Sequence, residues 1–172
     1  MTRLVPPDPD RCAEWIALVA DNDDSEPPGS GLWQVPQGAT PEGFAAHLSW
    51  STLYADTDRP VPRGVHYDQF WITDDADLLV GFVQVRHALN DRLRVRGGHI
   101  GYSVRRSRQG EGHATRALGL ALVHARGLGL DRVLITCDDT NAGSIRVIEA
   151  NGGVLADVTD GVRRSWVPTP PG

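Results

Sequence analysis

The sequence predicts an α/β (α+β) fold, a mixed, mostly antiparallel central sheet of six to seven strands flanked by about four helices. Three observations predict it. Strand-like segments follow one another closely between residues 68 and 105, which favours antiparallel pairing. A glycine-rich turn then joins a strand to a strongly helical segment. The strand after that helix must run parallel to the strand before it, because the connection is a long crossover.

Two helices are expected to precede the main sheet. Residues 10–20 carry apolar side chains at helical spacing. Residues 21–38 are acidic and then rich in Pro and Gly, which predicts a loop. Pro41 at a first helical position, with Thr40 as the cap, predicts a second helix that runs to about Tyr54.

The strands come next. Residues 68–73 and 78–88 are separated by a polar turn, which is typical of a hairpin, and Gly81 is a candidate for a bulge. Residues 90–98 form a basic segment that ends in glycine, and we interpret it as a connection. The third strand is predicted at residues 99–105.

The helix at residues 114–128 is the clearest element, because its apolar side chains repeat at i, i+3, i+4 and i+7. Gly127 and Gly129 end it. Thr140 or Asn141 can cap a later, shorter helix. A strand parallel to the third one is expected at residues 132–137, and that short helix at residues 142–150. Residues 154–158 and 162–167 predict the two strands of a hairpin around Asp160 and Gly161.

Composition indicates one domain, residues 1–172, with 40% hydrophobic residues available for a core. No run of about 18 apolar residues is found, so no membrane span and no membrane partner is expected. The N-terminus lacks the apolar stretch of a secretory signal. The two cysteines, Cys12 and Cys137, lie far apart in the sequence, and no metal or disulfide framework is expected from them. A cytoplasmic protein is therefore expected.

The formal net charge of −5 argues against a nucleic-acid partner, which would require clustered positive charge. The same charge is compatible with a cationic substrate, or with a role in solubility alone. Composition leaves both alternatives open.

The glycine-rich turn, Gln109 to Ala114, exposes several backbone N–H groups at a helix N-terminus, which is a ready site for phosphate oxygens. Its glycines let a ligand approach the backbone closely. The Gly-Lys-Ser/Thr sequence of a P-loop is not found, and a third glycine at Rossmann spacing is missing. The sequence therefore predicts a phosphate-bearing ligand of another class.

The pattern Gln-x-x-Gly-x-Ala at residues 109–114 resembles the acetyl-CoA pyrophosphate signature of the GNAT acyltransferase superfamily. The pattern Asn-x-x-Ser-x-x-x-x-Glu-x-x-Gly at residues 141–152 resembles a second element of many members. The resemblance extends over nearly all of the chain after about residue 68. It implies a GNAT fold with a splayed parallel strand pair. Its parts would be N-terminal helices and acceptor-side loops, an acyl-CoA-binding core and a C-terminal hairpin, at residues 1–67, 68–153 and 154–167.

The resemblance also implies which residues bind acetyl-CoA. Backbone groups at residues 103–105 would bond the pantetheine amides and the thioester carbonyl, and the N–H groups of residues 110–115 would hold the pyrophosphate. We expect the side chains of Glu111 and His113 to face solvent. Nearby arginines could offset Glu111, bind the 3′-phosphate or form a solvated face. The full expected set is Ser103, Val104, Arg105, Gln109, Gly110, Glu111, Gly112, His113, Ala114, Thr115, Asn141 and Ser144.

Direct attack of an amine on the thioester is the implied chemistry, with an acid that protonates the departing thiolate. Many members place a tyrosine seven residues after the Asn, where this chain has Ile148. Ser144 is the nearest polar alternative, unless it only caps its helix. His99 and Tyr102 are candidates for a base or a water-holding residue, unless they are structural. Asp138 and Asp139 could receive a cationic amine, or could belong to an ordinary loop.

Aromatic side chains upstream could form a wall for the acceptor, or could serve as core anchors. They are Trp33, Trp50, Tyr54, His66, Tyr67 and Trp71. The resemblance implies an acetyl-CoA-dependent N-acetyltransferase without a metal. We expect a primary amine on a small molecule as its leading acceptor and a protein or peptide amine as the second. The rival from another class is a catalytically silent acyl-CoA-binding sensor or scaffold. A longer acyl donor and a homodimer are open alternatives.

Overall fold

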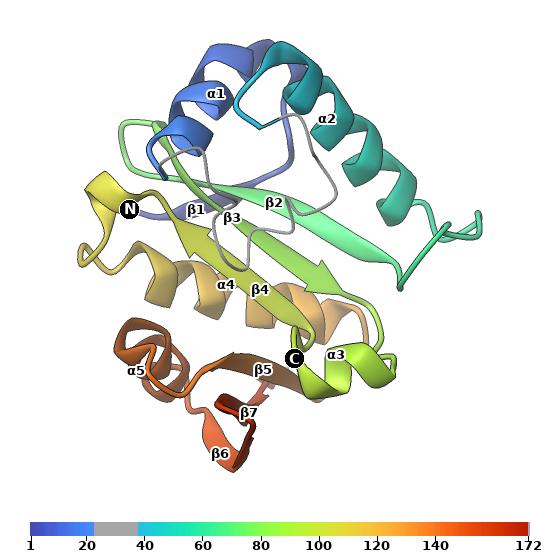
Figure 1. Cartoon of the computed structure of the whole chain (residues 1–172), viewed down its shortest axis with the longest axis vertical. Helices are drawn as coiled ribbons and strands as arrows, with labels where there is room; N and C mark the ends of the chain where they lie inside the picture. Colours follow the sequence, from blue (N-terminus) through green and yellow to red (C-terminus); the bar gives the residue numbers. More distant parts are fainter. Residues whose placement is uncertain (23–37, 172) are drawn as a thin grey trace.

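The computed structural model describes residues 1–22 and 38–171, and Figure 1 shows their arrangement. Seven strands occur in these residues: β1 (Arg3–Val5), β2 (Tyr67–Thr73), β3 (Leu79–Arg86), β4 (Ile100–Val104), β5 (Arg132–Asp138), β6 (Val154–Thr159) and β7 (Val162–Pro168). The helices are α1 (Cys12–Ala20), α2 (Pro41–Ala55), α3 (Asp91–Val95), α4 (His113–Gly127) and α5 (Ala142–Ala150). Short 3₁₀ turns, η1 (Pro9–Arg11) and η3 (Arg106–Arg108), precede α1 and follow β4. The mixed, mostly antiparallel α/β class predicted from the sequence is confirmed.

The strands form two antiparallel sheets, in the orders β1-β2-β3-β4 and β5-β7-β6. β4 and β5 both run from the side of α3 toward α5 (Figure 1). They meet at one end, where the His99 N–H donates to the Leu134 carbonyl at 2.7 Å, and form no ladder beyond it. The two strands therefore splay apart, and their separation opens the space in which the candidate site lies.

Helices cover both faces of the four-stranded sheet (Figure 1). On one face, α1 and α2 bury a cluster that includes Trp15, Phe44 and Phe82. On the other, α4 packs small and aliphatic side chains, among them Ala117 and Ala121, against the sheet. Each face thus has its own apolar core, and β4 is fixed between them with one edge open.

Several local predictions are confirmed by hydrogen bonds or backbone angles. The Thr40 side chain accepts the Gly43 N–H at 3.0 Å at the start of α2. Asn141, and not Thr140, caps α5 through its side chain. Asp160 and Gly161 have φ angles of 51° and 72°, so both central residues of the β6–β7 turn have the left-handed conformation that a two-residue hairpin favours.

Two elements were wrongly predicted. β1 precedes both helices and pairs with β2, whereas the sequence predicted that the helices come first. It has only three residues, and its strand conformation comes from that pairing. Residues 90–98, predicted as a connection, contain α3, which Asn90 begins by accepting the Leu93 N–H at 2.9 Å.

Gly81 lies beside a bulge, as its position suggested. The register between β2 and β3 shifts at Ile72/Thr73, which leaves Val80 as the extra residue. A Cβ on Gly81 would lie 2.2 Å from the backbone oxygen of Ser103. Glycine is therefore needed for β3 to approach β4.

Within the described residues, no helix combines the length and the apolar character that a membrane span requires.

Candidate functional site

The loop between β4 and α4 presents a row of unpaired backbone donors. Gly110 and Gly112 have φ angles of 83° and 78°, a left-handed conformation that favours glycine. The first N–H of α4 with an intrahelical acceptor belongs to Arg116, which bonds the Gly112 carbonyl at 3.2 Å. In the described part of the chain, the N–H groups of residues 110–115 have no acceptor. The loop can therefore hold an anion through several backbone donors.

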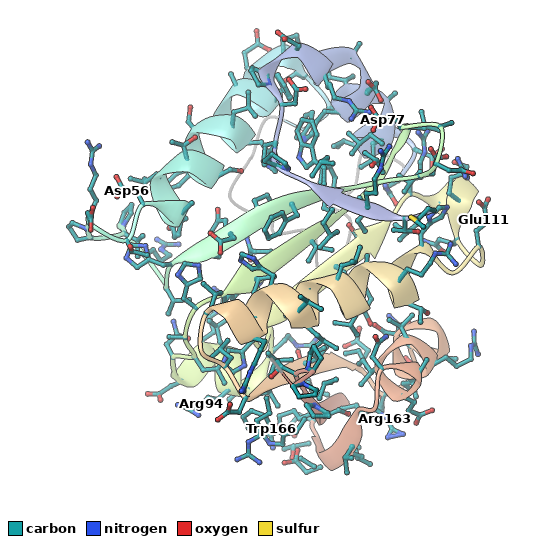
Figure 2. The ribbon with its side chains drawn as sticks, turned by 180° about the vertical axis from the view of Figure 1, so that it is seen from behind. Asp56, Asp77, Arg94, Glu111, Arg163 and Trp166 are labelled. Carbon is teal, nitrogen blue, oxygen red and sulfur yellow. The ribbon has the colours of Figure 1, made fainter. Side chains whose placement is uncertain are left out.

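Side chains lock this loop in place. Gln109 Nε2 donates to the Val104 carbonyl at 3.1 Å, which ties the loop to the end of β4. Arg108 pairs with Asp74 at 3.0 Å and with Glu111 at 2.9 Å. The hydrogen bond from Arg108 lowers the pKa of Glu111. Figure 2 shows Glu111 at the periphery of the molecule, so its charge is both paired and directed away from the row of N–H groups.

His113 corrects a prediction. We expected a solvent-facing side chain, but His113 is buried, and its Nδ1 lies 3.1 Å from Thr2 Oγ1. The first turn of α4 packs against β1, an element that the sequence did not predict. The side chain of His113 therefore anchors the helix, while its backbone N–H stays in the loop.

The open edge of β4 adds further donors. Arg105 N–H bonds the Val80 carbonyl on β3 at 2.8 Å. Since donors alternate in direction along an antiparallel strand, the N–H groups of Tyr102 and Val104 face the opposite edge, where no strand of the described residues pairs with them. The Ser103 hydroxyl is buried without a hydrogen-bond partner in the described residues. Polar backbone and side-chain groups are thus available for a ligand between β4 and β5.

A cavity of about 510 Å³, which we call the loop cavity, lies between this loop, β4 and α5. Every residue predicted to bind acetyl-CoA lines it except Arg105 and Glu111. Asn22, Gly143, Arg146 and Val147 also line it, and the sequence prediction missed them. The sequence contained a weak indication that Arg146 binds the ligand, because Arg146 follows Ser144 by two residues on a helix that was already expected to contact acetyl-CoA. It is exposed and has no partner in the described residues.

A second cavity of about 280 Å³, the strand cavity, lies between β4 and β5 on the side of α3. Arg86, Arg92 and Arg96 line it, together with Asp138. Both cavities share Tyr102, Asn141 and Ser144. A donor molecule in one cavity and an acceptor in the other would therefore meet at these three residues.

Tyr102 and Ser144 form a hydroxyl pair at that meeting point, with 2.8 Å between their oxygens. Burial raises the pKa of Tyr102 to about 12, so its hydroxyl keeps its proton at neutral pH. Asn141 accepts the Ser144 backbone N–H at 2.9 Å, so the cap does not use the serine hydroxyl. Ile148 is buried in the core. A polar pair thus stands near the position where the family tyrosine was expected.

His99, the other predicted catalytic candidate, is not brought to this point. It is buried outside both cavities, and its Nδ1 accepts the Leu134 N–H at 2.9 Å. Burial lowers its pKa to about 4. His99 therefore stays neutral and fixes the junction of β4 and β5.

The predicted cation receptor, Asp138, is already paired with Arg96 at 2.8 Å. Beside it, burial raises the pKa of the Cys137 thiol, which disfavours the thiolate. Three arginines line the strand cavity, so it is basic in character.

Three of the six aromatic residues proposed as an acceptor wall are buried. Tyr54, Tyr67 and Trp71 are buried, and the rings of the two tyrosines stack with 4.5 Å between their centroids. Trp50 and His66 are half-buried, and Trp33 lies outside the described residues. The core interpretation is confirmed for the three buried side chains.

A comparison with sequence models of protein families identifies one family. Residues 2–154 match a sequence model described as an acetyltransferase (GNAT) domain. A search of curated proteins found no significant match.

Three solved structures illustrate the likeness. Mycobacterium smegmatis RimJ in complex with CoA-disulfide is 24% identical, with a TM-score of 0.72 over 97% of this chain and 81% of its own. The Vibrio fischeri ribosomal-protein-S5-alanine acetyltransferase is 18% identical, with a TM-score of 0.67 over 98% of this chain and 92% of its own. A spermidine N-acetyltransferase SpeG chimera from Vibrio cholerae and hSSAT is 15% identical, with a TM-score of 0.61 over 98% and 95%. At these identities the likeness shows the shared fold alone.

Proposed function

Because the chain belongs to the GNAT acetyltransferase family, we propose that it transfers the acetyl group of acetyl-CoA to a small-molecule primary amine by direct attack in a ternary complex. The observation that carries this mechanism is the meeting of two cavities at Tyr102, Asn141 and Ser144. Such a layout lets both substrates be bound at once, so that no covalent enzyme intermediate is required.

The residues present suit acetyl-CoA. The N–H groups of residues 110–115 would hold the pyrophosphate, and Asn141 the pantetheine arm. The open N–H groups of Tyr102 and Val104 would bond the pantetheine amides and the thioester carbonyl. The buried, unpartnered Ser103 hydroxyl supports a polar ligand at this edge. We add Arg146 as a phosphate contact, because it lines the loop cavity with a guanidinium that has no partner among the described residues.

Acetyl-CoA supplies an acyl group that is already activated as a thioester. The amine nitrogen forms a bond to the carbonyl carbon, and the bond from that carbon to sulfur breaks. An N–H on the β4 edge stabilises the negative charge that develops on the carbonyl oxygen. Tyr102 and Ser144 together donate a proton to the departing sulfur, a role typically worth about 10²–10⁴ in rate. The amine loses its proton to water, since His99 has neither the position nor the pKa of a base.

The acceptor is proposed from the size of the strand cavity. At about 280 Å³ it lies near the lower end of ordinary ligand pockets, which favours a molecule about as large as an amino acid. A protein or peptide amine is the second candidate, because the ribosomal-protein-S5-alanine acetyltransferase shares the fold and its name points to a protein substrate. The SpeG chimera, which also shares the fold, is named instead for spermidine, a small polyamine.

The test is thiol release from acetyl-CoA across a panel of small amines and N-terminal peptides, with acetyl-CoA affinity measured separately by calorimetry. Turnover with small amines that exceeds turnover with peptides supports the proposal. Tight acetyl-CoA binding without turnover on any amine would instead favour the silent sensor or scaffold. Turnover with peptides alone would transfer the assignment to a protein amine.

A further inference from the structure

The strand cavity contains a buried cation without a counter-ion. Arg86, at the end of β3, is 8% exposed, and its Nη1 donates to the carbonyls of Gly97 at 2.9 Å and Gly98 at 3.1 Å. No carboxylate pairs with it in the described part of the chain. Burial, and then repulsion from Arg92, lowers its pKa to about 10, so it is still charged at neutral pH. Buried charges are normally paired, which makes Arg86 an exception that calls for a partner.

The surroundings of Arg86 strengthen this point. Arg92 and Arg96 line the same cavity, and among the residues that the structure describes Asp138 is its one acidic lining residue. Asp138 is engaged by Arg96 at 2.8 Å, so it does not neutralise Arg86. Within residues 1–22 and 38–171, three guanidinium groups and one carboxylate therefore line the cavity, in a chain whose formal net charge is −5. Local placement, and not overall composition, makes this site basic.

We propose that the acceptor amine also carries a carboxylate, which pairs with Arg86 and Arg92 while the amine reaches Tyr102 and Ser144. This inference rests on the proposed function and names its substrate class, a small amino carboxylate. Guanidinium groups bind carboxylates through two parallel hydrogen bonds, which would also orient the amine. The strand cavity extends from the arginines near α3 to the Tyr102–Ser144 pair, so one small molecule can contact both ends.

The experiment uses ω-amino carboxylates of increasing chain length, from glycine to 6-aminohexanoate, each beside its primary amide as a neutral control. The kcat/KM for each is measured by thiol release at saturating acetyl-CoA. We expect at least one carboxylate to exceed its amide by about tenfold to a hundredfold, the range of a hydrogen bond to a charged group. In Arg92→Gln that preference should disappear, so that the ratio of kcat/KM for each carboxylate to kcat/KM for its own amide falls toward one.

Arg94→Gln is the matched control. Arg94 lies on the same helix, is exposed and does not line the strand cavity; Figure 2 shows it near the periphery of the molecule. It should keep the carboxylate preference. Arg86→Gln should also lose the preference, but its two carbonyl contacts link it to folding. Arg92→Gln, on an exposed position, therefore gives the deciding result.

Equal kcat/KM for carboxylates and amides would overturn the inference and leave the proposed acetyl transfer intact. Faster turnover of peptides with acidic side chains than of any amino carboxylate would overturn the small acceptor. If none of the amines is acetylated although the protein binds acetyl-CoA, that result would contradict the proposed function itself. The three results can be told apart, because donor binding is measured without an acceptor.

Discussion

Substitution of Gly110 by aspartate tests the assignment of the phosphate loop. Gly110 has a φ of 83°, and a Cβ built on it meets nothing within 4 Å. The cost to folding is therefore the left-handed backbone alone, about 1–2 kcal/mol, which a domain of ordinary stability tolerates. The fold should persist. A loss of acetyl-CoA affinity in this variant would therefore arise from contact between the new side chain and the ligand, and not from unfolding.

The expected effect on binding follows from charge. Two unit charges about 4 Å apart repel by about 4 kcal/mol at an effective dielectric of about 20. Since about 1.4 kcal/mol corresponds to a factor of ten, the Kd for acetyl-CoA should rise by roughly 10³-fold at low salt. Added salt should reduce this effect, because the loop is exposed to solvent.

Gly129→Asp is a matched control. Gly129 has the same φ of 83° and nothing within 4 Å of its Cβ. It follows the far end of α4, a helix of 15 residues, and so lies about 20 Å from the loop at about 1.5 Å per residue. Calorimetric titration with acetyl-CoA and thermal unfolding should be run on both variants. We expect similar Tm losses but weakened binding only in Gly110→Asp. Wild-type affinity in a folded Gly110→Asp protein, or equal losses in both variants, would refute the loop assignment.

Three further predictions concern other parts of the molecule. Tyr102→Phe should lower kcat by about tenfold or more while the Kd for acetyl-CoA stays constant, and an unchanged kcat in single-turnover assays would exclude the proton-donor role. Burial lowers the pKa of His47 to about 4 from 6.5, so between these pH values His47 is protonated in the unfolded chain and neutral in the folded chain. His47 should therefore contribute a loss of about 3 kcal/mol of stability as the pH falls from 6.5 to 4, in addition to the loss from His99, whose pKa is lowered similarly. His47→Gln, which keeps an acceptor for Trp71, should remove the His47 part of this pH dependence in urea titrations. Gly81→Ala should cost about 1–3 kcal/mol, because its Cβ would meet the backbone of β4 at 2.2 Å, whereas Gly127→Ala, with open space, should be neutral or stabilising by chemical denaturation.

The sequence predicted well where local chemistry decides the structure. Gly110 and Gly112 stand where the backbone is left-handed, and glycine is the residue that enters this region at no steric cost. Thr40 and Asn141 cap their helices through contacts three residues away. Such features depend on neighbours along the chain, and sequence reasoning can reach them.

The parts missed depend on contacts between distant segments. Tyr102 and Ser144 are separated by 42 residues, so their pairing follows from how β4 and α5 pack. His113 was expected in solvent because its partner, Thr2, lies 111 residues away, directly before the unpredicted strand β1. In the sequence, Arg86 looks like an ordinary strand residue. Only the tertiary structure shows that it donates to the glycine carbonyls and lines the strand cavity. Burial of polar groups is set by the tertiary structure, and it is these groups that define the acceptor side.

A crystal structure with CoA and an amino carboxylate bound tests the central claim most directly. The account predicts the pyrophosphate on the N–H groups of residues 110–115 and the CoA sulfur within hydrogen-bonding reach of Tyr102 or Ser144, with the carboxylate against Arg86 and Arg92. A CoA sulfur remote from that pair, or a pyrophosphate bound elsewhere, would contradict it.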